Sequence, residues 1–152
     1  MHNRHLVYEN HYSIGKLGRG VFILYGLGES VSEEKNKAVI RSFHRALITN
    51  NVDEALSYFT DDAVLIWGPF TFQGKEEIRR WVIELGEMAR NLQFGEKSFV
   101  IQGNRVTIEF FMGLLTYDGK RGLIPGTGVY EFKNGKFQQI KITLSYGYVL
   151  IK

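Results

Sequence analysis

Two titratable side chains, His44 and Glu109, stand among apolar residues where they could take part in proton transfer. His44 follows Phe43 on the side of a predicted helix that also carries Leu47 one turn later. An imidazole in such a place can act as a base near neutral pH. The alternative is a half-buried histidine that makes only a local hydrogen bond. His44 is therefore a candidate catalytic residue whose role the sequence leaves open.

Glu109 lies in the middle of a predicted strand over residues 105–117. Alternation places four apolar residues on the opposite face of that strand. They are Val106, Ile108, Phe110 and Met112. If these residues fill the interior, Glu109 points outward, toward solvent or a dimer surface. If a bulge breaks the alternation, Glu109 faces the interior and its pKa is raised by burial.

The remaining polar clusters indicate structure more than chemistry. Asp61 and Asp62 are neighbouring carboxylates, but they follow Thr60 between a predicted helix and a predicted strand, where they suit a turn. The chain has no cysteine, and its other histidines share no set spacing with a carboxylate. These histidines are His2, His5 and His11. We predict neither a metal ion nor a cofactor.

Length and charge narrow the class of protein. A chain of 152 residues fits about one domain. Its net charge is only +3, and its lysines and arginines are scattered and gather in no basic patch, which argues against nucleic-acid binding. No apolar run approaches the ~20 residues needed to cross a bilayer, and no signal-peptide pattern precedes the domain. We therefore predict a cytoplasmic protein without a membrane segment.

The order of predicted elements indicates an α+β fold. Ser30 and Glu33 form a capping-box pattern that opens a helix, and Asn51 with Glu54 caps a second, short helix. A strand over residues 63–67 ends at Gly68–Pro69, and a third helix follows Gly74. Residues 1–29 are predicted to be an irregular extension with a short strand at 21–25, ahead of a domain over residues 30–152.

The second half of the chain is predicted to be an antiparallel sheet. Its strands cover residues 94–101, 105–117, 126–133 and 136–150. Asn134–Gly135 separates the last two and is a strong hairpin signal, because both residues tolerate positive φ. Helices first and strands afterwards favour α+β over alternating α/β.

Three segments give the chain a family resemblance. They read NVDEALSYFTDDAVLIW, GPFTFQGKEEIRRW and GVYEFKNGKFQQIKI. In this order and spacing, residues 33–148 resemble the SnoaL-like group of the nuclear-transport-factor-2-like (NTF2-like) superfamily. The resemblance implies a cone in which three N-terminal helices pack in a curved mixed or antiparallel sheet, with a pocket at the open end. It also implies a homodimer formed through the sheet.

The acid–base positions of the family are altered in this chain. Isomerase-like members carry an Asp where this chain has Gly68, and an acid on the penultimate strand near Gly126–Gly128. Their oxyanion-donating Tyr falls near His44. Cyclase-like members place an Asp late in the last strand, where this chain reads Thr143–Tyr146. A glycine cannot transfer a proton, and residues 135–152 contain neither Asp nor Glu. The acid–base residues of both groups are therefore missing from these positions, unless another strand supplies one.

The resemblance also places several aromatic residues on elements that line the cone. They are Tyr58, Trp67, Phe70, Phe72, Trp81 and Tyr130. Such a pocket suits a small hydrophobic or aromatic molecule. The sequence thus predicts a small-molecule-binding protein, with His44 and Glu109 as candidate catalytic residues. The alternatives are an isomerase, cyclase or lyase that uses proton transfer, and a module whose cone is simply filled.

Overall fold

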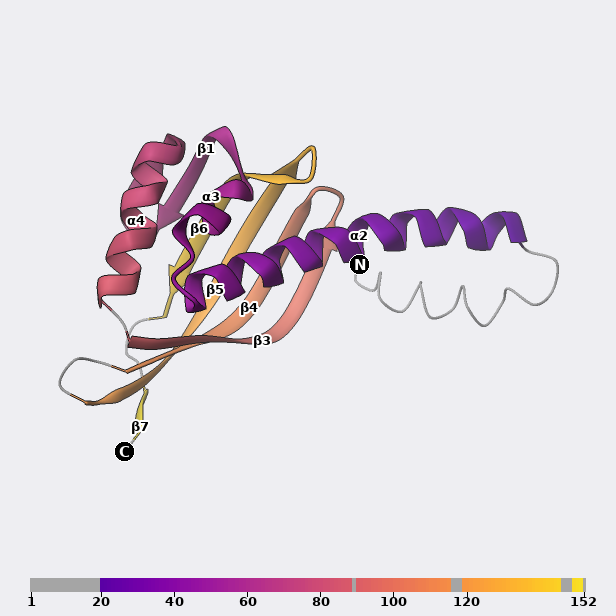
Figure 1. Cartoon of the computed structure of the whole chain (residues 1–152). Coiled ribbons are helices and arrows are strands. Elements are labelled where there is room, and N and C mark those ends of the chain that lie inside the picture. Colours follow the sequence, from indigo (N-terminus) through magenta and orange to yellow (C-terminus); the bar gives the residue numbers. More distant parts are fainter. Residues whose placement is uncertain (1–19, 89, 116–118, 146–148, 152) are drawn as a thin grey trace.

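The fold consists of helices on one side of a curved, unclosed sheet (Figure 1). The structure, a computed structural model, describes residues 20–88, 90–115, 119–145 and 149–151. The helices are α2 (Gly20–Ile48), α3 (Val52–Ser57) and α4 (Gly74–Met88). The strands are β1 (Phe59–Trp67), β2 (Phe70–Gln73), β3 (Arg90–Gln102), β4 (Arg105–Leu115), β5 (Arg121–Lys133), β6 (Lys136–Leu144) and β7 (Val149–Ile151). The predicted α+β cone is confirmed.

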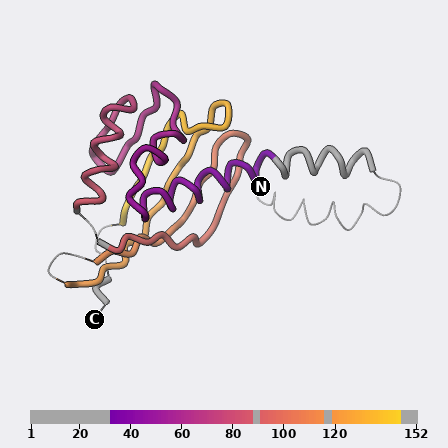
Figure 2. Tube along the Cα trace, in the orientation of Figure 1, coloured from indigo at the N-terminus to yellow at the C-terminus, as the bar shows by residue number. Residues whose placement is uncertain are grey.

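The sheet has the strand order β2-β1-β6-β5-β4-β3, and β7 pairs with β5 beyond this path. β1 and β6 run parallel, and the other pairs are antiparallel. β2 and β3 are therefore the edges of the sheet. The trace in Figure 2 follows the chain from the helices into the long strands that curve around them. This curvature creates an interior between the helices and the concave face.

The predicted helix start and N-terminal strand are wrong. α2 runs without interruption from Gly20, so Ser30 lies inside the helix and does not cap it, and residues 21–25 are helical. Nothing in residues 20–30 forces a break, because the segment lacks proline and an internal glycine costs a helix only about 1 kcal/mol. The predicted boundary at residue 30 therefore falls within a continuous helix. The rest of the predicted extension, residues 1–19, lies outside the described residues.

The shorter local signals are confirmed. The Asn51 side chain accepts a hydrogen bond from the Glu54 backbone N–H, which caps α3. Asn134 and Gly135 form the β5–β6 turn with φ of 53° and 78°. The last strand differs, because β6 ends at Leu144 and β7 is a separate strand.

The core fills the space between α2, α4 and the sheet. α4 buries an i, i+3, i+4, i+7 stripe made of Ile78, Trp81, Val82 and Leu85. Alternate residues of β4 are buried, from Val106 to Met112. Phe43 and Phe59 meet Phe137 at ring-centroid distances of 5.2 Å, and such edge-to-face pairs add about 0.5–1.5 kcal/mol beyond burial. The aromatic interior thus both stabilises the fold and forms the walls of the candidate site.

Candidate functional site

The interior of the cone contains a small apolar cavity. Its lining comes from α2, α4 and five strands of the sheet. The lining residues are Phe43, His44, Leu47, Leu65, Trp67, Trp81, Phe94, Phe110, Tyr130, Ile140 and Ile142. The free volume is about 10 Å³, which leaves room for one water molecule at most. The cavity is thus almost closed by its own side chains.

His44 projects into this interior from α2. The helix presents Ile40, Phe43 and Leu47 on the same buried side, so the position of His44 follows from the helical period. The imidazole is only 6% exposed, and it stacks on the Phe94 ring with centroids 4.5 Å apart and planes inclined by 21°. The structure therefore buries the predicted candidate against the edge strand β3.

Tyr130 is the hydrogen-bond partner of His44. The hydroxyl oxygen of Tyr130, on β5, lies 2.8 Å from Nε2 of His44. Tyr130 is 1% exposed, and the two residues are 86 positions apart in the chain. A neutral imidazole either donates to the hydroxyl oxygen or accepts the hydroxyl proton, depending on its tautomer. The sequence placed both residues near the pocket but did not pair them.

Burial shifts the pKa values of this pair in opposite directions. Desolvation lowers the pKa of His44 to about 4, although the negative charge of Glu96 opposes the shift. Desolvation raises the pKa of Tyr130, and Glu96 raises it further. At neutral pH the imidazole is therefore uncharged and the phenol keeps its proton. A neutral imidazole beside a tyrosine hydroxyl can hold or transfer one proton within a dry environment.

Two glycines of β5 make room for the aromatic rings. A Cβ atom on Gly128 would lie 2.7 Å from Cε1 of Tyr130 and 3.1 Å from Cδ1 of Ile142. A Cβ atom on Gly126 would lie 2.7 Å from Cζ of Phe110. Neither position accepts a larger residue without displacing a ring. The rings of Tyr130 and Phe110 thus occupy the space that an acidic side chain would need on this strand.

Three of the six predicted aromatic residues line the cavity: Trp67, Trp81 and Tyr130. The two indole rings lie 5.3 Å apart, with Trp81 buried and Trp67 half-buried at the rim. The sequence did not single out Phe94 and Phe110, which also line the cavity. The buried face that alternation predicts for β4 already contained Phe110.

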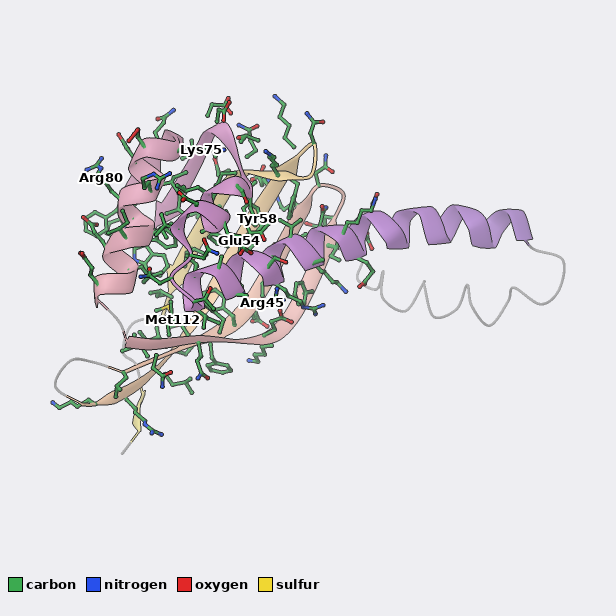
Figure 3. The ribbon with its side chains drawn as sticks, viewed as in Figure 1. Arg45, Glu54, Tyr58, Lys75, Arg80 and Met112 are labelled. Atoms are coloured by element: carbon green, nitrogen blue, oxygen red, sulfur yellow. The ribbon has the colours of Figure 1, made fainter. Side chains whose placement is uncertain are left out.

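The other three predicted aromatic residues lie elsewhere. Phe70 is 62% exposed on β2. Phe72 packs against the core from the same strand without lining the cavity. The Tyr58 hydroxyl donates to Oε2 of Glu54 at 2.7 Å, and Figure 3 shows these two side chains beside α2. Burial and this hydrogen bond raise the pKa of Tyr58. It belongs to the contact between α2 and α3.

Glu109 lies on the outer face of the sheet. It is exposed, and its Oε1 accepts a hydrogen bond from the Ser98 hydroxyl at 2.9 Å. Pairing between β4 and β5 is regular, so alternation holds and Glu109 points away from the buried residues on either side of it. The structure therefore does not bring Glu109 and His44 together.

Asp61 and Asp62 are exposed at the start of β1. Asp62 accepts a hydrogen bond from the Thr60 hydroxyl at 3.1 Å, and this contact lowers the pKa of Asp62. Asp61 forms an ion pair with Lys75 at 3.6 Å. Neither carboxylate lines the cavity. The predicted turn at residues 60–62 is wrong, because these residues belong to β1, where the pairing with β6 is irregular.

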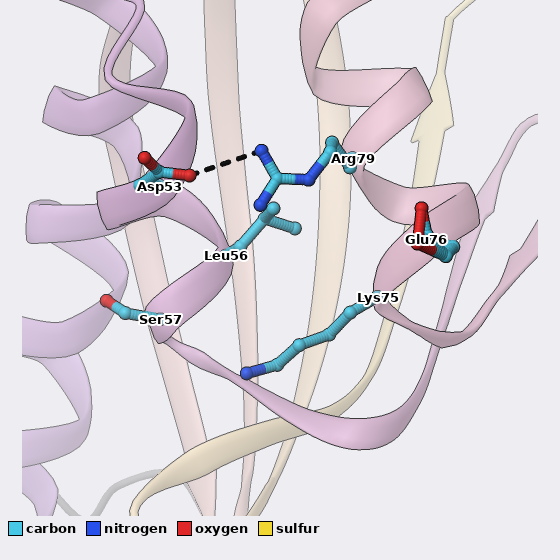
Figure 4. Close-up of a pocket in the computed structure, with 6 residues that line it drawn as sticks. All are labelled: Asp53, Leu56, Ser57, Lys75, Glu76 and Arg79. Carbon is cyan, nitrogen blue, oxygen red and sulfur yellow. Dashed lines mark hydrogen bonds and ion pairs between the residues drawn. The ribbon is translucent and has the colours of Figure 1, made fainter.

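A wider, more polar hollow lies on the surface between α3 and α4 (Figure 4). Its volume is about 360 Å³, and its lining residues are Asp53, Leu56, Ser57, Lys75, Glu76 and Arg79. Arg79 pairs with Asp53 at 3.2 Å across the hollow. The positive charges of Arg79 and Lys75 are thus compensated by the carboxylates of Asp53 and Asp61. In the described part of the chain, no three side chains of metal-binding type gather into a possible ion site.

The fold and the cavity together define a class of protein: an α+β cone whose aromatic interior holds one histidine–tyrosine pair. Residues 40–140 match the SnoaL-like domain model. The chain therefore belongs to the SnoaL-like family, as the sequence resemblance predicted. The chain matches none of the curated proteins with which it was compared. In the residues that the structure describes, no helix is long and apolar enough to span a membrane.

Solved structures share the fold at low sequence identity. One is a hypothetical protein with a ketosteroid isomerase-like fold from Catenulispora acidiphila, in complex with trimethylamine. It has 18% identity and a TM-score of 0.65, covering 71% of this chain and 85% of that chain. TerC co-crystallised with polyporic acid has 14% identity and a TM-score of 0.66, with coverage of 73% and 92%. An epoxide hydrolase from M. tuberculosis has 16% identity and a TM-score of 0.65, with coverage of 74% and 84%.

Proposed function

We propose that this protein binds a small, flat, largely apolar molecule that carries one hydroxyl or carbonyl group. The observation that supports the proposal is the buried hydrogen bond between His44 and Tyr130 inside an aromatic interior. Burying two polar groups is costly unless each has a partner. An apolar pocket with one such pair is a common arrangement for holding and orienting a ligand.

The pair suits either kind of polar group on the ligand. If His44 donates to the Tyr130 oxygen, the Tyr130 hydroxyl proton is available to a carbonyl oxygen of the ligand. If Tyr130 donates to His44, the Tyr130 oxygen accepts from a ligand hydroxyl. The surrounding rings, among them Phe94 and Trp81, offer flat apolar contacts.

Binding requires the cavity to widen, because about 10 Å³ does not hold a ligand. The trimethylamine complex of the protein from C. acidiphila and the polyporic acid complex of TerC are examples of this fold with small molecules. They support a ligand-binding role, while the ligand proposed for this chain follows from its own side chains. The closed interior is then the unliganded form of the site.

Tryptophan fluorescence can test the proposal directly, because the chain has two tryptophans and both line the cavity. p-Cresol and toluene form a matched pair of probes that differ by one hydroxyl. We expect p-cresol to change the emission and raise the melting temperature, and Tyr130→Phe to weaken its binding about tenfold while leaving toluene unaffected. Glu109→Gln is the control and should bind like the wild type. Equal responses to both probes, or none, would refute the proposed polar contact.

A second candidate function is proton transfer by an isomerase, cyclase or lyase. The neutral imidazole 2.8 Å from a tyrosine hydroxyl favours it, since a base must be unprotonated at the working pH. Turnover with His44 as base should rise through pH 4 to a plateau near neutrality, and His44→Gln should abolish it. A candidate substrate whose turnover survives His44→Gln would count against this role.

We also propose that the protein forms a homodimer through the outer face of the sheet and is cytoplasmic. Half-buried apolar residues gather on this face, among them Phe111 and Pro125, which are directly paired, and Val129. Light scattering at micromolar concentration should give twice the monomer mass, and Val129→Lys should return it to one. A monomeric wild-type protein would rule out the dimer.

A further inference from the structure

The boundary between α2 and the edge strand β3 differs from the other boundaries of the cone. Inside the sheet, β1, β6, β5 and β4 each pair with a neighbouring strand on both sides. β3 has one such neighbour, and the face of β3 that turns to the interior meets α2 through side chains. We call this contact the α2–β3 seam. It comprises Lys37, Arg41 and His44 of α2 with Phe94, Glu96 and Phe99 of β3.

The seam is a series of contacts that descend from the surface to the cavity. Lys37 and Arg41 lie over the Phe99 ring, at 5.3 and 5.2 Å from its centroid. Nε of Arg41 lies 3.0 Å from Oε2 of Glu96, and Nη2 lies 3.0 Å from Oε1. Deepest of all, His44 stacks on Phe94. Arg41 and His44 are three residues apart on α2, so the ion pair lies about one helical turn from a residue that lines the cavity.

A bulge in β3 is what makes this arrangement possible. Glu96 pairs with Phe110 and Ser98 with Glu109, so Lys97 is an extra residue in the ladder. In a regular strand without a bulge, residues 96 and 99 are three positions apart and would lie on opposite faces. With it, both face α2 and contact Arg41. The bulge at Lys97 therefore allows two residues of β3 to contact the same residue of α2.

The seam is also the boundary that can open with the least disruption. Trp67 closes the rim on the other side, but its backbone is paired to Phe70 on one side and to Ile142 on the other. α4 is held by a buried apolar stripe. The Arg41 and Glu96 side chains, in contrast, are 48% and 28% exposed, and partly exposed ion pairs exchange with water at small cost.

We infer that the α2–β3 seam is the entrance to the cavity and that the ion pair between Arg41 and Glu96 is a latch that keeps it closed. Breaking the ion pair lets β3 bend at Lys97 and moves Phe94 away from His44. The space that opens lies beside the hydrogen bond between His44 and Tyr130. The purpose of the opening rests on the proposed ligand-binding function, but the opening itself can be measured without a ligand.

Acrylamide quenching of Trp81 measures the opening. In a Trp67→Phe background the buried Trp81 is the sole indole, so quenching reports solvent access to the cavity. Glu96→Gln keeps the shape of the side chain and removes its charge. We expect Glu96→Gln to raise the quenching constant about two- to fivefold, because losing a partly exposed ion pair changes an equilibrium constant by about this factor. Glu131→Gln breaks the ion pair with Arg105 on the outer face and is the matched control.

An unchanged quenching constant in Glu96→Gln, or an equal rise in Glu131→Gln, would overturn the inference. A second experiment does not depend on the stability of Glu96→Gln. The chain has no cysteine, so Arg41→Cys with Glu96→Cys can be bridged by a short bismaleimide. The bridged protein should show less quenching than the same protein before bridging and should lose p-cresol binding. If p-cresol still binds as before, the seam is not the entrance; if quenching falls but the wild type never binds p-cresol, only the ligand proposal fails.

Discussion

The interior of the cone and the outer face of the sheet each contain one of the two candidate catalytic residues. His44 follows a phenylalanine and Glu109 precedes two, so each is a titratable residue next to aromatic residues. The structure buries His44 against Tyr130 and leaves Glu109 in solvent beside Ser98. The neighbouring residues in the sequence therefore do not determine which titratable residue is buried in the interior. The face on which helical period or strand alternation places the side chain decides it.

The largest expected difference between the two faces is in packing. Phe137 is fully buried in the interior, whereas Phe111 is half-buried on the outer face. We expect Phe137→Ala to lower the free energy of unfolding by about 3–5 kcal/mol, because it leaves a cavity among aromatic rings. Phe111→Ala should cost about 1 kcal/mol. Urea denaturation at one protein concentration measures both, and similar losses would show that the interior is not the main source of stability.

The pH dependence of stability should depend on His44. Its pKa is about 4 in the folded protein and 6.5 when unperturbed, so the unfolded chain takes up this proton first as the pH falls. The free energy of unfolding should therefore fall by roughly 3 kcal/mol between pH 6.5 and pH 4, with no further loss from this group below that range. Above pH 6.5 His44 is uncharged in both the folded and the unfolded protein, so the free energy of unfolding returns to its full value.

His44→Gln is the variant that isolates this effect. Glutamine does not titrate and can still hydrogen-bond to Tyr130, so the difference in unfolding free energy between wild type and variant should change with pH across the same window. Carboxylates titrate in both proteins and cancel in that difference. A difference that stays constant from pH 7 to pH 4 would mean that His44 is exposed to solvent.

The sequence predicted those features that depend on short-range patterns. The α3 cap at Asn51 and the β5–β6 turn at Asn134–Gly135 need only a few neighbouring residues to form. The order of elements and the family resemblance then predicted the cone. His44 was found because a helical period of 3.6 residues places it beside Phe43 on the buried side.

The parts that the sequence did not predict depend on long-range geometry. The cavity is closed because several rings from different elements have matching volumes, and no single segment contains that information. The bulge at Lys97 becomes visible only through pairing with β4. The start of α2 was missed because a good capping pattern at Ser30 is also compatible with the interior of a helix.

A smaller difference is expected from single hydrogen bonds on the two faces. Tyr130→Phe removes the partner of a buried imidazole and should cost about 1–3 kcal/mol. Ser98→Ala removes an exposed contact with Glu109 and should cost about 0.5 kcal/mol or less. Adding His44→Leu to Tyr130→Phe should cost less than the sum of the two changes, because they remove the same interaction. Full additivity would mean that the hydrogen bond contributes nothing to stability.

The smallest effect is expected at Glu109 itself. Glu109→Gln keeps the size of the side chain and its hydrogen bond with Ser98, and the residue is exposed, so the free energy of unfolding at neutral pH should change by less than about 0.5 kcal/mol. An interior carboxylate would behave differently, since the neutral amide would avoid the cost of burying a charge and stability would change by several kcal/mol. The size of this one change therefore reports the face on which Glu109 lies in solution. A large stabilisation would place it in the interior and reopen its role as a catalytic partner of His44.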